Sequence, residues 1–506
     1  MTGVASDLRG SAPWFARLAE RPFLPVALLA LVLMALDPVG YVGGGWDDWY
    51  YLDAARCWAE HGYCLPGDHW ARRVTLVAPL AGSIALFGES RAVLWLVPAA
   101  YSLAALALLV AVVARPFGRP AALLAGLALL LTPAFGERML HVGVDIPELA
   151  FALAAIACLQ RAAQARSGLW AAAGGALLGL AILTRPTALA MLPLFVGAML
   201  LVPSLRRGLL PFALGGLAPL LIEAGAFALM TGDPLRPWAL SLAHGAIPSS
   251  ELEPGVDLSR SPLFNIAFID GWRPAAGIEV HWTIDAFLNL IAHPATGFTL
   301  LAAFALLLLN GRRLGRPEAG GRAIPLLILA AALYFGALVY ALAVDPKPRM
   351  FLPVMAVAAA VIGVLAAEAW RNGQKLLPAA LAILLAVNGT LGVVGQPDVK
   401  SIVRAAGALL RAPHGPLAVE RSTRRLLALE PLAAALPEQR PGARIPVLIL
   451  GRDDCGIAAA RLDGRWRAAR QIETGSRLAG DGRTLLCILA PVGDAPRQGE
   501  QLEGQE

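Results

Sequence analysis

The sequence predicts an α-helical membrane protein that crosses the bilayer many times and carries a small α/β domain at its carboxyl end. Of its 506 residues, 57% are hydrophobic and only 15% are charged, and the mean hydropathy is +0.63. Soluble domains carry a charge on about a quarter of their residues, so this composition excludes an ordinary soluble globular protein. Apolar runs of roughly 17–25 residues, each long enough to cross about 30 Å of hydrocarbon as a helix, recur as far as residue 395.

About eleven of these runs are expected to span the bilayer. They lie at 22–41, 91–114, 120–136, 145–161, 169–184, 186–203, 208–230, 292–310, 323–344, 350–369 and 376–395. The run 75–87 has only about 13 residues, too few to span, and is interpreted as an interfacial or re-entrant helix. No A-x-A cleavage site follows the first run, so we expect the first helix to be retained.

Basic residues in the short connections indicate the orientation. With this set of spans, the basic residues and the amino terminus fall on the same side of the membrane. The positive-inside rule predicts that this side is cytoplasmic. The basic residues are Arg9, Arg17, Arg21, Arg115, Arg119, Arg161, Arg166, Arg206, Arg207, the arginines of 312–322, Arg371 and Lys375. The first outer loop (42–90) and the large outer loop (231–291) then face the extracytoplasmic side.

The cysteines agree with this orientation. Cys57 and Cys64 fall in the first outer loop, and Cys455 and Cys487 fall in the carboxy-terminal tail. Disulfides persist in oxidising compartments, so both pairs are disulfide candidates, with unpaired structural cysteines as the alternative. An unbroken helix from Cys57 to Cys64 would hold the sulfur atoms too far apart, so a bridge requires a break near Gly62.

The composition changes after the last span, at about Gln396. IPVLILG at 445–451 and TLLCILAP at 484–491 have the pattern of short buried strands, and helical patterns lie around 398–411 and 422–436. The sequence therefore predicts a transmembrane domain at 1–395 and an extracytoplasmic α/β domain at 396–506. Long domains translocate largely regardless of charge, so the basic character of the second domain does not conflict with this location.

Carboxylates lie at the outer ends of several predicted helices. Asp47 and Asp48 follow three glycines and begin an amphipathic helix that is expected to lie along the membrane surface. Asp145 begins a span just after a very short outer loop that also contains His141. Helix capping is the structural alternative for each aspartate, whereas charges at the boundary of a span usually indicate function.

Cations also occupy outer turns. Arg185 lies between two apolar spans, and Lys347 and Arg349 lie just before another. They could simply reach for the interface or bind lipid headgroups, but the positive-inside rule makes short outer loops unusual places for arginine. Guanidinium groups hold phosphate, and carboxylates act as general bases or bind metal ions. A phosphate-bearing lipid attacked by a nucleophile requires both kinds of group.

Other site patterns are weak or absent in the sequence. There is no Walker-type loop, no typical Cys/His zinc spacing and no Gly-x-Ser-x-Gly elbow, and no nucleic acid is expected as a partner. His281, Asp285 and His293 are a weak metal signal, and a divalent metal ion is only a candidate cofactor. Glu223, the only acid deep inside a span, is interpreted as a helix-packing partner or as part of a lipid pocket.

Five motifs follow one another in a specific order on the predicted outer face. They are Asp47, Asp48, Tyr51 and Arg56; Ala78-Pro79-Leu80 through Phe87-Gly88 followed by Arg91; Asp145-Ile-Pro; Leu183-Thr184-Arg185; and Pro348-Arg349-Met350-Phe351-Leu352-Pro353. Together they resemble a family of GT-C bacterial membrane glycosyltransferases related to protein O-mannosyltransferases and the lipid A aminoarabinose transferase. The likeness covers roughly residues 20–395, and it departs from the family where Asp48 replaces Glu and Met350 replaces Tyr.

The resemblance implies a GT-C-like fold. It also implies that the protein transfers a sugar, with inversion, from a polyprenyl-phosphate donor, and that its partners include this donor and the membrane lipids. The acceptor would be an envelope protein, lipid A or a polysaccharide. The implied catalytic residues are Asp47 as general base, Asp48 and Asp145, and the implied substrate-binding residues are Tyr51, Arg56, His141, Arg185, Lys347 and Arg349. One alternative is a transporter or flippase of a lipid-linked or anionic solute, but transporters often consist of two repeated halves, and no such repeat is seen in this sequence. The other alternative is a membrane scaffold.

Overall fold

The computed structural model describes two compact units. The described residues are 20–36, 47–242, 287, 290, 291, 295–310, 323–341, 348–374, 376–394, 399–411, 415–420, 423, 424, 427, 435–440, 445–452, 455, 462, 466–476 and 483–492. Unit 1 comprises 1–38 and 50–394, and unit 2 comprises 39–49 and 395–506. Lys347, Lys375, His281, Asp285, His293 and most of the large outer loop lie outside the described residues.

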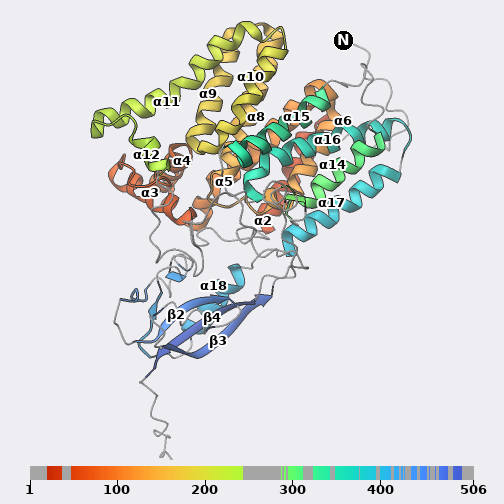
Figure 1. Ribbon diagram of the computed structural model, residues 1–506. Helices are drawn as coiled ribbons and strands as arrows, with labels where there is room; N and C mark the ends of the chain where they lie inside the picture. Colours follow the sequence, from red (N-terminus) through yellow and green to blue (C-terminus); the bar gives the residue numbers. More distant parts are fainter. Residues whose placement is uncertain are drawn as a thin grey trace, which may run out of the picture. The chain divides into compact units, whose positions relative to one another are not determined.

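Unit 1 is built of helices, as Figure 1 shows. They are α2 (Phe23–Leu36), α3 (Asp47–His61), α4 (Val74–Phe87), α5 (Arg91–Phe117), α6 (Arg119–Leu130), α7 (Pro133–Gly136), α8 (Asp145–Ala165), α9 (Gly168–Thr184), η1 (Pro186–Met191), α10 (Leu192–Leu201), η2 (Arg206–Gly208), α11 (Leu209–Thr231), α12 (Arg236–Leu242), α14 (Gly297–Asn310), α15 (Ala323–Gly336), η9 (Ala337–Ala341), η10 (Pro348–Phe351), α16 (Leu352–Arg371) and α17 (Leu376–Val394). The first residues of α3, 47–49, belong to unit 2 in this division.

Four helical stretches in the described part of the chain are long and apolar enough to cross a membrane by themselves. They are Ala92–Phe117, Asp145–Ala165, Arg206–Thr231 and Arg349–Arg371. Shorter apolar helices occupy most of the other predicted spans, and one of these spans, 120–136, is broken. The break falls before Pro133, which lacks an N–H group and disfavours helical backbone at Thr132. The class of helical membrane protein is confirmed, and the count of about eleven spans stays a prediction.

The helices α9 and α11 pack through glycines. A Cβ on Gly175 of α9 would lie 1.9 Å from the carbonyl oxygen of Phe212, and one on Gly215 of α11 would lie 2.0 Å from that of Ala172. Small residues allow the backbones of membrane helices to approach this closely. The close approach fixes α9, and with it the turn that carries Arg185.

Gly215→Ala is expected to lower the free energy of unfolding by about 1–3 kcal/mol, because the added methyl group must push α9 and α11 apart. Gly225→Ala in the same helix is the matched control, since no atom lies within 4 Å of the Cβ position at Gly225. There the higher helix propensity of alanine should leave stability unchanged or slightly raised. Thermal unfolding of the detergent-purified protein measures both, and equal loss in the two variants would contradict the close packing.

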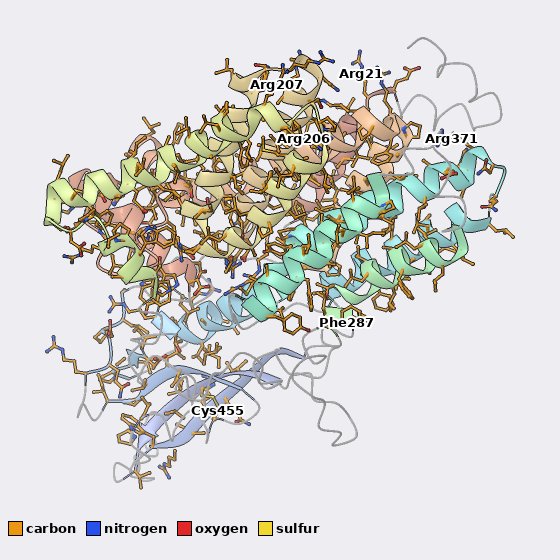
Figure 2. The ribbon with its side chains drawn as sticks, turned by 45° about the horizontal axis from the view of Figure 1, so that its top comes forward. Arg21, Arg206, Arg207, Phe287, Arg371 and Cys455 are labelled. Atoms are coloured by element: carbon orange, nitrogen blue, oxygen red, sulfur yellow. A yellow bond between two sulfur atoms is a disulfide. The ribbon has the colours of Figure 1, made fainter. Side chains whose placement is uncertain are left out.

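Basic residues gather at one end of unit 1. Figure 2 shows Arg21, Arg206, Arg207 and Arg371 along one side of the view and Phe287 on the opposite side. The turn between α8 and α9 lies at the basic end, because Gly168 packs against Pro211 and Ala171 against Gly208. Since α8 begins at Asp145 and α9 ends just before Arg185, these two residues lie at the opposite end of the same helical pair.

Unit 2 is a four-stranded sheet with one helix packed on it. Its elements are α18 (Val399–Arg411), β1 (Ala418–Val419), β2 (Val447–Arg452), β3 (Trp466–Ser476) and β4 (Arg483–Pro491). The strand order is β1-β2-β4-β3, with β1 parallel to β2 and the other pairs antiparallel. Leu409 and Leu410 of α18 pack with Leu448 and Leu486 of the sheet.

The sequence predicted β2 and β4 but missed β3. The described side chains 467–471 of β3 are exposed, and they are mostly polar or small, so the strand lacks the apolar pattern of a buried strand. It forms an edge of the sheet, where such side chains are common. Cys455 and Cys487 form a disulfide with a Cα–Cα distance of 5.9 Å. Most of the predicted helix at 422–436 lies outside the described residues.

Candidate functional site

The start of α8 and the end of α9 bring opposite charges together. Arg185 leaves α9 with extended backbone (φ −154°, ψ 121°), as expected for a residue that precedes a proline. Its Nη1 atom donates to Oδ1 of Asp145 and lies 3.9 Å from Oε2 of Glu148. Asp145 and Glu148 are buried. The predicted anion and the predicted cation therefore form one buried ion pair.

Glu148 adds a second carboxylate that the sequence reading missed. It follows Asp145 by three residues, so both side chains lie on the same face of α8. Thr187 donates its hydroxyl to Oε1 of Glu148 at 3.4 Å. The i, i+3 spacing was the available signal, but Glu148 is followed by an apolar span and resembled a first-turn helix residue.

Burial lowers the pKa of Arg185, but the pKa lies above its ordinary value because Asp145 and Glu148 raise it by more; the nearby Arg349 lowers it. Arg349 belongs to the short helix η10, whose Met350 carbonyl oxygen accepts a hydrogen bond of 3.0 Å from the Tyr334 hydroxyl. Tyr334 is buried in α15 and was not predicted as a site residue. Its hydrogen bond holds the η10 turn that carries Arg349.

Arg72 pairs with Glu223, and all three of its guanidinium nitrogens donate hydrogen bonds. Its Nε and Nη2 atoms donate to the two carboxylate oxygens of Glu223 at 3.2 and 2.6 Å. Nη1 donates to the Pro237 carbonyl oxygen at 2.5 Å and to the Ser241 hydroxyl. The guanidinium carbon also lies 5.5 Å from the ring centroid of Trp238. Of the two interpretations of Glu223, the structure thus favours a packing partner, here for an arginine that lies 151 positions away in the sequence.

Arg73, the next residue, has a different environment. It is buried, and its Nε and Nη1 atoms have no hydrogen-bond partner among the residues that the structure describes. Burial lowers its pKa to about 10; Arg72 and Arg185 also lower it, whereas Tyr51 and Glu223 raise it. A pKa of about 10 still leaves the group charged at pH 7. Buried donors of a charged group that lack hydrogen bonds are costly, and groups with perturbed pKa values cluster at functional sites.

Opposite stability effects are expected at these two adjacent arginines. Arg73→Met should raise the free energy of unfolding by about 1–3 kcal/mol, because it removes donors that are buried and unsatisfied. Arg72→Met should lower it by about 3–5 kcal/mol, because it leaves the Glu223 carboxylate buried without its cation. Thermal or denaturant unfolding at pH 7 measures both, since Arg73 is charged there in the folded and unfolded chains. Destabilisation by Arg73→Met comparable to that by Arg72→Met would contradict this assignment.

Hydroxyl groups tie the surrounding elements together. The Thr75 and Thr184 side chains share a hydrogen bond of 2.7 Å, and the Tyr101 hydroxyl donates to the Thr75 carbonyl oxygen at 2.6 Å. Thr75 lies in the first turn of α4, and Thr184 is the last residue of α9. Arg73 precedes the first of these residues and Arg185 follows the second, so this bond holds the two cations in one region.

The first outer motif is distributed over α3. Asp47 and Asp48 form its first turn, where Oδ1 of the buried Asp48 accepts the Trp49 N–H at 3.1 Å, and Tyr51 is buried one turn later. Tyr51 interacts electrostatically with Arg73, so α3 contributes to the same region of unit 1. Arg56, whose role in binding substrate stays a prediction, pairs with the carboxylates of Asp53 and Glu89.

Arg56 donates to the Glu89 carboxylate at 2.8 and 2.6 Å and to Asp53 at 3.1 Å. Burial opposes the effect of these acids, but they still raise the pKa of Arg56. His141 lies in the turn before α8, three residues ahead of the N-cap Val144. The structure thus gathers Arg73, Asp145, Glu148, Arg185, Tyr334 and Arg349, and sequence reasoning had named Asp145, Arg185 and Arg349 of these.

Comparison with known proteins gives a family match over part of the chain and structural matches over most of it. Residues 77–223 match the family model of dolichyl-phosphate-mannose-protein mannosyltransferases. The structure is similar to that of ArnT from Cupriavidus metallidurans bound to undecaprenyl phosphate, with a TM-score of 0.51 and 16% identity over 92% of this chain and 97% of that one. Residues 77–223 thus match this mannosyltransferase family, and the chain shares the GT-C fold of its structural neighbour. The resemblance inferred from the five motifs is thereby confirmed.

A second GT-C structure has a similar fold. The oligosaccharyltransferase of Archaeoglobus fulgidus, crystallised with zinc and sulfate, gives a TM-score of 0.52 at 15% identity, over 83% of this chain and 59% of that one. At such identities the likeness shows the fold alone. No match was found among curated protein sequences. The family match begins in α4, ends in α11 and therefore includes Asp145, Glu148, Arg185 and Glu223.

Proposed function

We propose that this GT-C protein transfers a sugar from a polyprenyl-phosphate donor to an acceptor of the cell envelope on the extracytoplasmic face, with inversion at the anomeric carbon. The observation that carries the proposal is the buried guanidinium of Arg73, with its unsatisfied donors, next to the cluster of Asp145, Glu148 and Arg185. The arginines Arg73, Arg185 and Arg349 outnumber the two carboxylates in this region. The region therefore suits a ligand with negative charge, as a lipid phosphate has.

The lipid phosphate would accept hydrogen bonds from Nε and Nη1 of Arg73, which have no partner in the described protein. Arg185 would contribute charge from the other side, held by its bond to Asp145. As the bond from the sugar to the phosphate breaks, negative charge grows on the leaving phosphate. Fixed cations at a buried site stabilise that charge, and this electrostatic contribution is usually the largest in catalysis.

Asp47 would act as the general base that removes the proton from the acceptor hydroxyl or amine. Asp145 was predicted either to orient the acceptor or to share this role. Its ion pair with Arg185 supports a positioning role, since the carboxylate is already engaged by the guanidinium. The buried Asp48 would stabilise the start of α3.

The predicted orientation is part of the proposal. Arg206 and Arg207 lie at the basic end of unit 1, and the ion pair of Asp145 and Arg185 lies at the other end. The positive-inside rule supports a cytoplasmic basic end, which would place the site on the extracytoplasmic side. A donor attached to a polyprenyl chain could then reach the site from the outer leaflet.

The proposal is tested by transfer of radiolabel from polyprenyl-phosphate sugars to envelope acceptors in membranes that contain the protein. Label that depends on the protein, and that undecaprenyl phosphate competes away, is the expected result. Arg73→Gln should raise the KM for the donor at least tenfold, whereas Arg371→Gln at the basic end should leave it unchanged. Absence of transfer with every donor would contradict the proposal and favour a transporter of a lipid-linked solute.

A further inference from the structure

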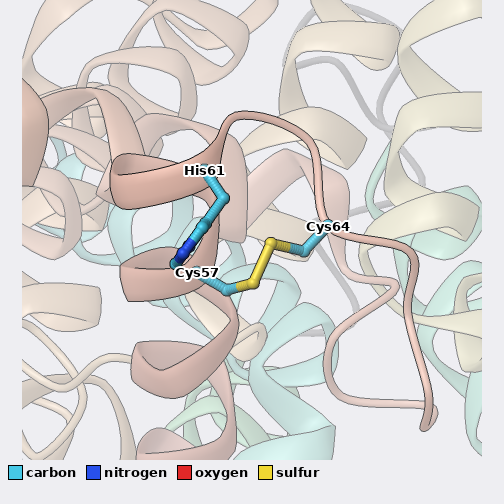
Figure 3. A group of neighbouring side chains, drawn as sticks. All are labelled: Cys57, His61 and Cys64. Carbon is cyan, nitrogen blue, oxygen red and sulfur yellow. A yellow bond between two sulfur atoms is a disulfide. The ribbon is translucent and has the colours of Figure 1, made fainter.

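Three side chains outside the catalytic region form a compact group at the end of α3. Cys57 and His61 lie four residues apart, on the same face of the helix. Gly62, with φ +80°, ends the helix and turns the chain so that Cys64 returns to that face. Figure 3 shows the three side chains, whose ligand atoms all lie within 4.8 Å of one another. Cys57 and Cys64 form a disulfide with a Cα–Cα distance of 6.1 Å.

We propose that, once this disulfide is reduced, the Cys57, His61 and Cys64 side chains form a binding site for a thiophilic metal ion, with zinc(II) as the probe. Two thiolates and one imidazole are a ligand set that soft or borderline metal ions prefer. Zinc takes Cys sulfur at about 2.3 Å and His nitrogen at about 2.0–2.1 Å, in tetrahedral geometry. The three ligand atoms then need only a small movement, and a water molecule completes the coordination.

The surrounding contacts would keep the site in place without the sulfur–sulfur bond. The Trp58 indole N–H donates to the Cys64 carbonyl oxygen at 3.1 Å, and the Trp58 and Tyr63 rings lie 4.7 Å apart. These contacts fix the backbone of the turn independently of the disulfide. His61 is 71% exposed, so its ring can rotate toward the sulfur atoms at little cost.

The disulfide and the metal ion exclude each other. A phosphine reductant and one water molecule convert the disulfide into two thiols and a phosphine oxide, a transfer of two electrons. Zinc binding then releases the two thiol protons, because only the thiolate is a metal ligand. In the oxidised protein the two sulfur atoms share a bond and carry no thiolate charge, so the group cannot hold the ion. Redox state thus decides between a covalent link and a metal site at the same turn.

Zinc uptake by the full-length protein, purified in detergent, tests the proposal. The experiment uses a Cys455→Ser/Cys487→Ser background, so that the disulfide of unit 2 contributes no thiols. After reduction and removal of the phosphine, the metal content is measured by elemental analysis, and cobalt(II) serves as a spectroscopic probe. We expect about one zinc per reduced chain, none in the oxidised chain, and a thiolate-to-cobalt charge-transfer band.

His61→Ala is the decisive variant, because it keeps the disulfide and so should fold like the parent protein. It is expected to weaken zinc binding at least tenfold in a chelator competition, and bound zinc should slow alkylation of Cys57 and Cys64 by a maleimide. Cys158→Ser, which removes the free cysteine in α8, is the matched control and should bind zinc as the parent does. Unchanged affinity in His61→Ala, or no zinc in the reduced parent, would overturn the proposal.

Discussion

Arg185→Gln should lower the rate of sugar transfer by about 10²- to 10³-fold, the effect of removing one preorganised donor that faces developing negative charge. The side chain is nearly buried, with 13% of its surface exposed, and it holds its place through Asp145. Glutamine can still donate one hydrogen bond but brings no charge to the leaving phosphate. The loss should therefore appear mainly in kcat, because the charge on the phosphate grows only as the bond to the sugar breaks.

Transfer of radiolabel at saturating donor measures this effect. Arg185→Lys should recover part of the rate, because lysine restores the charge without the bidentate geometry. Arg206→Gln is the matched control at the basic end of unit 1 and should transfer at the wild-type rate. A wild-type kcat in Arg185→Gln would remove Arg185 from the mechanism, whereas loss of the folded protein in gel filtration would limit its role to structure.

Asp47→Asn should lower transfer by about 10²- to 10⁴-fold, the usual contribution of a positioned general base. Asparagine has nearly the same size and can still cap a helix, so the first turn of α3 should remain intact. The variant thus separates the two interpretations of this residue. A catalytic base loses its function in the asparagine variant, and a capping residue does not.

The control is Asp53→Asn. Asp53 lies in the same helix, and its exposed side chain pairs with Arg56. It should transfer sugar at the wild-type rate, because Arg56 keeps its bond to Glu89. Both variants should unfold at the wild-type temperature. Transfer at the wild-type rate by Asp47→Asn would contradict the assignment of Asp47 as the general base. A lowered unfolding temperature without loss of transfer would favour the capping interpretation.

The sequence by itself determined the class of protein and the position of most elements. Hydropathy depends on composition over about 20 residues, so it predicted the helical membrane domain without knowledge of contacts. The strands β2 and β4 were found because their apolar runs are local signals, whereas the exposed edge strand β3 carries no such signal. The break at Thr132-Pro133 was not predicted, because proline alone does not decide where a helix ends: Pro79, Pro98 and Pro219 lie inside unbroken helices.

Only the tertiary structure decided which charges meet. Arg72 and Arg73 are adjacent in the sequence and chemically identical, but Glu223 from α11 pairs with the first, whereas Nε and Nη1 of the second have no hydrogen-bond partner in the described protein. Likewise, Glu148 became a site residue only because α9 ends beside it and places Arg185 within 3.9 Å. Periodicity and hydropathy report the local chain, whereas the partner of a buried charge depends on which distant helices pack together.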